Sequence, residues 1–342
     1  MADLTIRGAG IFGLSIAWEA LLRGARVRVV DPNGVGSGSS GGVVGALQPH
    51  APDPWNPKKQ FQLESLRLAA PFWAEVEAVS GMPTGYGRVG RLQPLRSDRE
   101  VLLARSREGA AEANWGETGL WTVAVSTNDG WEPPSPTGLF LRDSLSAILN
   151  PALAVDSLAA AVRSRGGEIC TEADDDTPTV WATGWRGLED LSLALGRPAG
   201  NGVKGQAALL SHNAAGAPQI YAEGLHIVPH LDGTLAIGST SERDFENPTD
   251  TDSQLDELLD RAATMLPVLH GAKVLKRWAG VRPRSPSRAP LLGPWPGRAG
   301  HFVANGGFKI GFGMAPKVAK VMADLILDGI DTIPPEFHTD SL

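Results

Sequence analysis

The sequence is poor in cysteine, in excess positive charge and in long apolar runs, and each lack excludes a class of protein. The single cysteine, Cys170, excludes an internal disulfide framework and any Cys-rich metal site, and it favours a reducing compartment, so we expect a cytoplasmic protein. A formal net charge of −7 gives no general attraction to nucleic acid or anionic lipid, so neither partner is expected. The apolar stretch Gly8 to Trp18 is too short to span a bilayer, and the glycine motif begins already at Gly8, so we expect neither a membrane span nor a signal peptide.

The spacing of the histidine, serine and cysteine residues also does not suit a metal site or a catalytic nucleophile. The seven histidines are scattered, and the only close pair, His226 and His230, lies in a strand-like stretch. Four residues at about 3.3 Å each place that pair too far apart for one ion. The GSTSE segment does not resemble a GxSxG nucleophile elbow, and Cys170 has no obvious base beside it. We therefore expect no metal and no catalytic nucleophile.

A glycine-rich motif stands at the start of the chain, in LTIRGAGIFGLSIAWEALLRGARVRVVD, residues 4–31. Leu4–Arg7 and Val27–Asp31 are apolar enough for strands, and the apolar residues between them recur at helical spacing. The motif's glycines are Gly8, Gly10 and Gly13. In a strand–helix–strand unit they allow a tight turn, a close approach to a pyrophosphate and close helix packing, and Asp31 can accept hydrogen bonds from a ribose. The unit predicts a dinucleotide site without distinguishing NAD from FAD.

A loop of small residues follows, DPNGVGSGSSGGVVGALQPH, residues 31–50. A nicotinamide dehydrogenase usually continues directly with helix and strand, whereas this loop offers a second approach of backbone to a longer, buried cofactor. The residues that would make this approach are Ser37, Ser39, Ser40, Gly41 and Gly42. On composition alone, a flexible surface linker is the alternative.

The rest of the chain carries further motifs in a definite order. They are LNPALAVDSLAAAVRSRGGEI (149–169), the ATG turn of TVWATGWRG (179–187), VKGQ (203–206), HIVPHLDGTLAIGSTSE (226–242), AGVRPRSP (279–286) and NGGFKIG (305–311). Together with the N-terminal unit and the SSGG loop, this order and spacing resemble the D-amino-acid oxidase and glycine oxidase family of FAD-dependent amine oxidoreductases. The likeness covers nearly the whole chain.

The resemblance implies an α/β fold, with a Rossmann-like FAD-binding domain and an inserted antiparallel-sheet (α+β) substrate domain. A chain of 342 residues is long enough for two such domains. We expect the FAD-binding domain at residues 1–80, 138–200 and 276–342, and the substrate-binding domain at 81–137 and 201–275. Relatives generally have a small β-meander where residues 170–178 alone join two strands here, so we expect a less covered flavin edge.

The resemblance also implies non-covalent FAD, with its pyrophosphate on the three glycines and its adenosine ribose on Asp31. A covalent link through Cys170 is not expected, because that residue lies far in sequence from the C-terminal loops that surround the flavin ring. The cofactor-binding residues carried over are Gly8, Gly10, Ile11, Phe12, Gly13, Asp31, Pro32, Ser37, Ser39, Ser40, Gly41, Gly42, Val43, Ala182, Thr183, Gly184, Trp185, Arg282, Gly306, Gly307, Phe308, Lys309 and Ile310.

For the substrate, the resemblance places a carboxylate-binding arginine in the RP of AGVRP, which is Arg282. A buried guanidinium that grips a carboxylate through two parallel hydrogen bonds would orient the α-hydrogen toward the flavin. From the residue alone, a solvated or structural arginine is the alternative. Arg284 and Arg288 are expected to be surface or loop residues.

Two positions depart from the family pattern. Lys309 stands where relatives carry an arginine in the C-terminal loop, and it can attract a carboxylate only as a point charge. His226 stands where relatives often present a tyrosine. We expect both to contact the substrate; the alternatives are a solvated loop lysine and a strand histidine paired to backbone.

The C-terminal helix is expected to begin after the NGGFKIGFG loop, with Pro316 in its first turn, and to end at Gly329. Its positive end would stabilise negative charge on the flavin pyrimidine edge, and a packing helix without an electrostatic task is the alternative.

The resemblance implies oxidation of the C–N bond of an amino acid or small secondary amine, with hydride transfer to flavin N5, an imine that hydrolyses, and H2O2 release if oxygen is the acceptor. The cofactor carries the chemistry, so no protein acid or base is required. Two alternatives are a NAD-dependent dehydrogenase and a flavin-binding protein without turnover. Which amine, which stereochemistry and which oligomeric state lie beyond the sequence.

Overall fold

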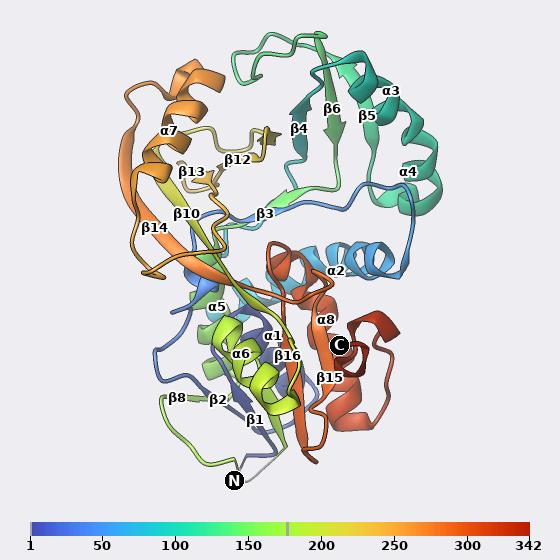
Figure 1. Cartoon of the computed structure of the whole chain (residues 1–342), viewed down its shortest axis with the longest axis vertical. Helices are drawn as coiled ribbons and strands as arrows, with labels where there is room; N and C mark the ends of the chain where they lie inside the picture. Colours follow the sequence, from blue (N-terminus) through green and yellow to red (C-terminus); the bar gives the residue numbers. More distant parts are fainter. Residues whose placement is uncertain (1, 176–177) are drawn as a thin grey trace.

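The computed structural model describes residues 2–175 and 178–342, and these fold around two large sheets. Figure 1 shows the sheets one above the other along the long axis, with the long strands β10 (Asn201–Ser211) and β14 (Lys273–Arg284) running from the upper sheet toward the lower one. Within the described ranges, no helix is long and apolar enough to cross a membrane.

The lower sheet has six strands and a mostly parallel core. In spatial order they are β15 (Leu291–Pro294), β16 (His301–Asn305), β9 (Thr179–Trp181), β1 (Leu4–Arg7), β2 (Val27–Val30) and β8 (Glu168–Cys170). All neighbouring pairs are parallel except β15 with β16. The strands come from the two ends and the middle of the chain, as the resemblance implies.

Helices cover both faces of this sheet. On one face, α1 (Ile11–Leu22), α5 (Pro151–Ser164) and α8 (Gly311–Asp328) share a large apolar core with the strands, and α2 (Pro57–Ser80) packs on α5 and α8. On the other face, α6 (Gly184–Leu195) buries Leu188 and Leu191 against Leu291 and Val303. This is the doubly wound α/β arrangement.

The upper sheet has eight strands and is antiparallel apart from one pair. In spatial order they are β14, β10, β13 (Thr234–Gly238), β12 (Leu225–Pro229), β11 (Gln219–Ala222), β4 (Arg91–Pro94), β6 (Leu139–Asp143) and β5 (Trp121–Val125). The pair β11 and β4 is parallel.

The remaining elements are β3 (Ala46–Leu47) paired with β7 (Ala147–Ile148), the helices α3 (Asp98–Ser106), α4 (Glu108–Trp115) and α7 (Ser253–Met265), and the 3-10 turns η1 (Ser39–Gly41), η2 (Gly116–Thr118), η3 (Pro267–Leu269), η4 (Pro335–Phe337) and η5 (Thr339–Ser341).

Alternation along the strands gives the upper sheet two different faces. Ile227, Leu235 and Ile237 pack with α7 on one face. Val228 and Ala236 lie on the opposite face, where they pack with Val43 of the SSGG loop. By the same alternation His226 shares the second face with Val228, and this face therefore looks toward the N-terminal glycine segments.

The α/β fold with an added, largely antiparallel sheet is confirmed, and one local expectation is wrong. Pro316 does not lie in the first turn of the C-terminal helix, because α8 already begins at Gly311, inside the NGGFKIGFG segment. Met314 and Ala315 are fully buried in the core, which holds this extra turn in place. Gly329 ends the helix in a left-handed conformation, as expected.

The domain boundaries stay a prediction. Strands β6 and β14 fall wholly or mostly in segments assigned to the FAD-binding domain, yet both belong to the eight-stranded sheet. A division that follows the sheets would move these two strands to the substrate-binding domain.

Candidate active site

The loops that follow four strands meet at one edge of the lower sheet. The neighbouring strands β16, β9, β1 and β2 are parallel, so their carboxyl ends lie at the same edge. Directly after these ends come Gly306, Ala182, Gly8 and Asp31. Ligands of open α/β sheets bind at this edge, so the edge is a ready site for a dinucleotide.

Close backbone packing explains the glycines of the first turn. Gly8 has φ +108°, and a Cβ there would lie 2.3 Å from the carbonyl oxygen of Ala182. A Cβ at Gly13 would lie 1.9 Å from the carbonyl oxygen of Gly8. Neither position accepts a side chain without moving backbone, so the turn stays narrow enough for the N–H groups of α1 to face a ligand.

Asp31 lies where the sequence predicts, at the end of β2. Its Oδ2 accepts a hydrogen bond from the Ala9 N–H at 2.9 Å, and its Oδ1 accepts one from the Asn33 N–H at 3.0 Å. A carboxylate has about four acceptor positions, so Asp31 retains capacity for two ribose hydroxyls.

The SSGG loop is ordered and packed against the first turn. Ser40 Oγ accepts a hydrogen bond from the Ile11 N–H at 3.0 Å, and the Gly36 N–H donates to the Ala9 oxygen at 3.0 Å. The alternative of a flexible surface linker is therefore wrong. Ser40 and Val43 are buried, whereas Pro32 and Ser37 are exposed.

Asn305 ties the C-terminal loop to the ATG turn. Its Nδ2 donates to the Gly184 oxygen at 2.8 Å, and its Oδ1 accepts from the Gly306 N–H at 2.8 Å. The ATG turn and the start of the NGGFKIG loop are thus held together beside the glycine turn. Sequence reasoning missed Asn305 as a site residue, although it begins the NGG motif.

Arg282 is buried, with 8 % of its surface exposed, and only part of its donor set is used. Its Nη2 donates to Ser239 Oγ at 2.6 Å and to the Thr240 oxygen at 3.1 Å, while its buried Nη1 has no partner in the described chain. The guanidinium lies over Gly205, where a Cβ would be 1.6 Å from Nη2. Gly205 thus provides the space that the arginine fills.

Glu242 holds the loop that carries the Arg282 partners. Its side chain accepts hydrogen bonds from Thr240 Oγ1 and, at 3.1 Å, from Gln206 Nε2, and it lies 3.7 Å from Lys204 Nζ. The VKGQ and GSTSE motifs therefore form one network that fixes the position of Arg282.

Lys309 is brought next to Arg282 by a backbone hydrogen bond between their neighbours. The Phe308 N–H donates to the Pro283 oxygen at 2.9 Å, and Gly307 bridges to Arg284. Phe308 has φ +41°, a left-handed conformation that is uncommon for bulky non-glycine residues. The Lys309 side chain is partly buried and partly open to solvent, and no carboxylate among the described residues forms an ion pair with it.

His226 and Lys309 line a common cavity of about 200 Å³. Its polar lining comprises Gln48, His50, Gln62, Tyr221, His226 and Lys309, with Ile310 and Gly313 at the start of α8. His226 Nδ1 lies 3.3 Å from Gln48 Nε2 and its ring lies 4.8 Å from that of Tyr221. The alternative of a histidine paired to backbone is thus not what the structure shows.

Positive charge dominates this cavity. Burial, followed by the charges of Lys309, Arg91 and Arg282, lowers the pKa of His226 to about 3, so the imidazole is neutral. Burial and the neighbouring Arg282 also lower the pKa of Lys309. Burial lowers the pKa of Arg282 to about 10, against the opposing effect of Glu242, and the guanidinium stays charged at neutral pH.

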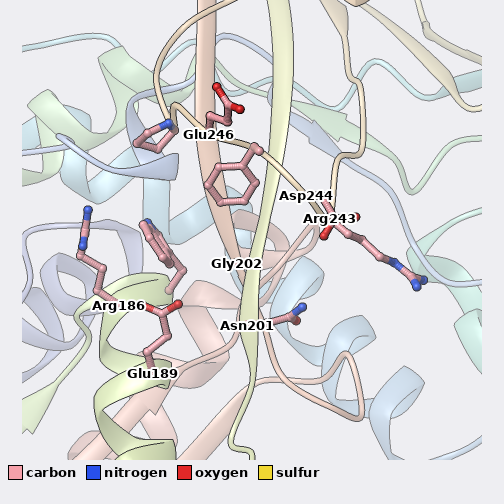
Figure 2. Close-up of a pocket in the computed structure, with 10 residues that line it drawn as sticks. Arg186, Glu189, Asn201, Gly202, Arg243, Asp244 and Glu246 are labelled. Carbon is pink, nitrogen blue, oxygen red and sulfur yellow. The ribbon is translucent and has the colours of Figure 1, made fainter.

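A larger, open groove lies elsewhere, at the start of α6 and β10 (Figure 2). Its volume is about 860 Å³, and it is lined by Trp185, Arg186, Glu189, Asn201, Gly202, Arg243, Asp244, Phe245, Glu246 and Pro248. It contains one predicted cofactor residue, Trp185, whose ring meets that of Phe245 edge-on at 6.1 Å. His226, Arg282 and Lys309 do not line it.

Trp278 is a further residue that sequence reasoning missed. It lies on β14 four residues before Arg282 and therefore on the same face of the strand. Its ring would be 3.2 Å from a Cβ at Gly42, so β14 contacts the SSGG loop directly. The alternation of side chains along RWAGVRP places Trp278 on the same strand face as Arg282, and this signal could have identified it.

The expected less covered flavin edge at residues 170–178 is described only in part, because residues 176 and 177 lie outside the described residues. Before them, Asp175 forms an ion pair with Arg7 at 2.7 Å.

The donor set fits FAD. The edge offers narrow glycine turns, the N–H groups of α1 and α8, the Asp31 carboxylate, and an unpartnered guanidinium nitrogen beyond them. Among the described residues, no group of three or more His, Cys, Asp or Glu side chains could hold a metal ion.

Comparison with known proteins agrees with this geometry. The DAO family model, described as FAD dependent oxidoreductase, matches residues 3–325. The glycine oxidase of Pseudomonas aeruginosa is 28 % identical over 373 residues, covering 94 % of each chain. The crystal structure of glycine oxidase from Geobacillus kaustophilus superposes with a TM-score of 0.85 at 21 % identity, covering 98 % of each chain. That of iminodiacetate oxidase from Chelativorans sp. BNC1 gives 0.81 at 23 % identity, covering 97 % of each.

The family match covers nearly the whole chain and includes every segment that meets at the sheet edge. It confirms the sequence-based predictions of the family, of an oxidoreductase and of FAD, and it removes the alternative of a NAD-dependent dehydrogenase. The chain belongs to the DAO family of FAD-dependent oxidoreductases.

Proposed function

We propose that the protein oxidises the C–N bond of an amino acid or a small secondary amine. The observation that carries this proposal is the unpartnered, buried Nη1 of Arg282, which is available for a substrate carboxylate next to a cavity without acidic residues. Relatives named as glycine oxidases, 27 to 28 % identical over more than nine tenths of this chain, support the same substrate class.

The cofactor would be held by the sheet edge. We assign the pyrophosphate to the turn of Gly8, Gly10 and Gly13 with Ser40, and the adenosine ribose to Asp31. The start of α8 carries no side-chain cap, so its free N–H groups are available to the flavin pyrimidine edge. The chemistry that FAD supplies when bound is acceptance of a hydride.

The protein's own residues bind and orient the substrate. Arg282 would grip the α-carboxylate, and the network around Glu242 keeps that guanidinium in place. Neutral His226 places no positive charge beside the substrate amine, which must lose its proton before oxidation. Water then hydrolyses the imine product. We further propose that oxygen serves as the final acceptor, with release of H2O2.

The experiment is anaerobic mixing of the purified yellow protein with a broad panel of amino acids and secondary amines, including glycine, sarcosine, L-proline and D-alanine. We expect at least one to bleach the flavin absorbance, and readmitted oxygen to restore the colour with formation of H2O2. If no amine bleaches the flavin, the protein is a flavin-binding protein without turnover. Recovery only with an artificial electron acceptor would instead identify a dehydrogenase.

A further inference from the structure

Two cationic side chains converge on the candidate substrate site, although one substrate carboxylate needs only one of them. Arg282 and Lys309 come from distant parts of the sequence, and the Phe308–Pro283 hydrogen bond at 2.9 Å fixes their backbones side by side. The unusual φ of +41° at Phe308 shows that this approach is maintained at a conformational cost.

The two cations nevertheless address different places. Arg282 lies over Gly205 and bonds to Ser239 and Thr240, with Nη1 free. Lys309 lines the 200 Å³ cavity, whose lining does not include Arg282. One ligand carboxylate at Nη1 therefore leaves the ammonium of Lys309 without an anion.

Nothing in the described lining of this cavity neutralises Lys309. The lining contains no aspartate or glutamate, and its polar side chains are amides, imidazoles and a phenol. The buried carboxylate nearby, Asp143, is already paired with Arg91 at 2.7 Å. Tyr221, which lines the same cavity, also carries a hydroxyl donor that a carboxylate can accept from.

Further cations stand on the approach to Lys309. Arg288 is close enough to lower the pKa of Lys309, and the Lys58 ammonium donates to the Arg288 carbonyl oxygen at 2.8 Å. The protein as a whole has a net charge of −7, so this cluster of positive charge opposes the general field. A local field of this sign raises the local concentration of anions.

We propose that the preferred substrate is an amine with two carboxylates, one bound by Arg282 and the second held in the cavity by Lys309. This inference rests on the proposed function, because it assigns the substrate class of the same site. The inference goes beyond the proposed function because it assigns the substrate's side chain or second arm to Lys309. The α-carboxylate is then bound by Arg282 alone.

The test compares acids with their isosteric amides. Aspartate against asparagine, and glutamate against glutamine, in both D and L forms, differ by one charge at nearly constant shape. We expect kcat/KM for flavin reduction to be about tenfold or more higher for the acid of the accepted enantiomer, because the amide cannot form the charged contact with Lys309. In Lys309→Met this acid-to-amide ratio should fall to about one, and Lys309→Arg should restore it.

A matched control is Lys276→Met, which removes an exposed lysine from the far half of β14 and should leave the ratio unchanged.

Binding gives a second readout that needs no turnover: succinate should perturb the flavin absorbance spectrum at lower concentration than butyrate, and Lys309→Met should abolish the difference. The proposal would be overturned if the acid and its amide had equal kcat/KM, or if the preference for the acid persisted in Lys309→Met. Failure of every amine to bleach the flavin would count against the proposed function. The comparison of succinate with butyrate would still show whether Lys309 binds a second carboxylate.

Discussion

The cofactor edge and the proposed substrate cavity are built in different ways. At the cofactor edge, backbone meets backbone: Gly8 and Gly13 have no room for a Cβ, and the groups available to a ligand are the N–H donors at the starts of α1 and α8. In the cavity, side chains from the segments around Gln48, Tyr221, His226 and Lys309 meet, although these segments are far apart in sequence.

This difference separates a site set by the backbone from a site set by side chains. A backbone site depends on glycine spacing and accepts one kind of ligand, a phosphate with its sugar. A side-chain site changes its substrate with one substitution, because charge and shape lie in the side chains themselves. We therefore expect changes at the first site to remove the cofactor and changes at the second to alter the choice of substrate.

The largest effect is expected at Gly13. Gly13→Val would place a Cβ 1.9 Å from the Gly8 oxygen and should destabilise the fold by about 3 kcal/mol, with loss of bound FAD. Flavin content and denaturant unfolding measure both consequences. Gly109→Ala, where nothing lies within 4 Å of the added Cβ, is the control and should retain its flavin. A Gly13→Val protein with full flavin content would refute the backbone account.

Arg282→Met should have the next largest effect, since it removes the proposed carboxylate ligand without removing the cofactor. We expect the apparent dissociation constant for the amino acid in anaerobic flavin reduction to rise about 100-fold, while flavin content stays normal. Unchanged affinity would reject the carboxylate clamp.

Glu242→Gln should have a smaller effect, of the same kind as Arg282→Met. The amide can still accept from Thr240 but no longer attracts Lys204, so Arg282 should be less well positioned. We expect about a tenfold rise in KM with little change in kcat, in line with the worth of one charged hydrogen bond. A fall in kcat at constant KM would mean that Glu242 acts on the chemical step.

The pH dependence distinguishes Lys309 from His226. Only the protonated ammonium attracts an anion, and burial with the neighbouring Arg282 lowers the pKa of Lys309. Succinate affinity, measured above about pH 7 where the ligand is ionised, should therefore fall as pH rises, beginning below the usual lysine pKa of about 10.4. Arg282, whose pKa is lowered to about 10, adds to this fall at the upper end of the range, and Lys309→Met should keep only that part. His226, with its pKa near 3, should contribute no step near neutral pH. A fall of equal size in Lys309→Met would assign the titration to another group.

The smallest effect is expected in the open groove of Figure 2. Its lining mixes two arginines with three acidic residues and does not include His226, Arg282 or Lys309, so Arg243→Gln should leave KM and flavin content unchanged. A clear rise in KM would show that this groove, and not the cavity beside Lys309, receives the substrate.

Sequence reasoning reached much of the fold and of the backbone site, because their signals are local. The spacing Gly8, Gly10 and Gly13, followed by a strand ending at Asp31, predicts the first unit, and the structure has it at the expected residues. The sequence pattern predicts too late a start for α8, since Pro316 suits a first turn while the burial of Met314 and Ala315 is a tertiary effect.

The cavity was harder to predict, because strand pairing across long sequence separations creates it. His226 and Lys309 were singled out through the family pattern. Tyr221, opposite His226 in the β11–β12 register, and Gln48 were not, since no local spacing links them to the site. The network of Gln206 and Glu242 around the Arg282 partners likewise appears only when β10, β13 and β14 are paired.

The most direct test of this account is a crystal structure of the FAD-loaded protein with succinate. The account predicts one carboxylate on Arg282 Nη1 and the other within hydrogen-bond distance of Lys309 Nζ, between the flavin and the face of the eight-stranded sheet that carries His226. Succinate bound in the open groove, or bound to Lys309 with Arg282 Nη1 still unpartnered, would contradict it.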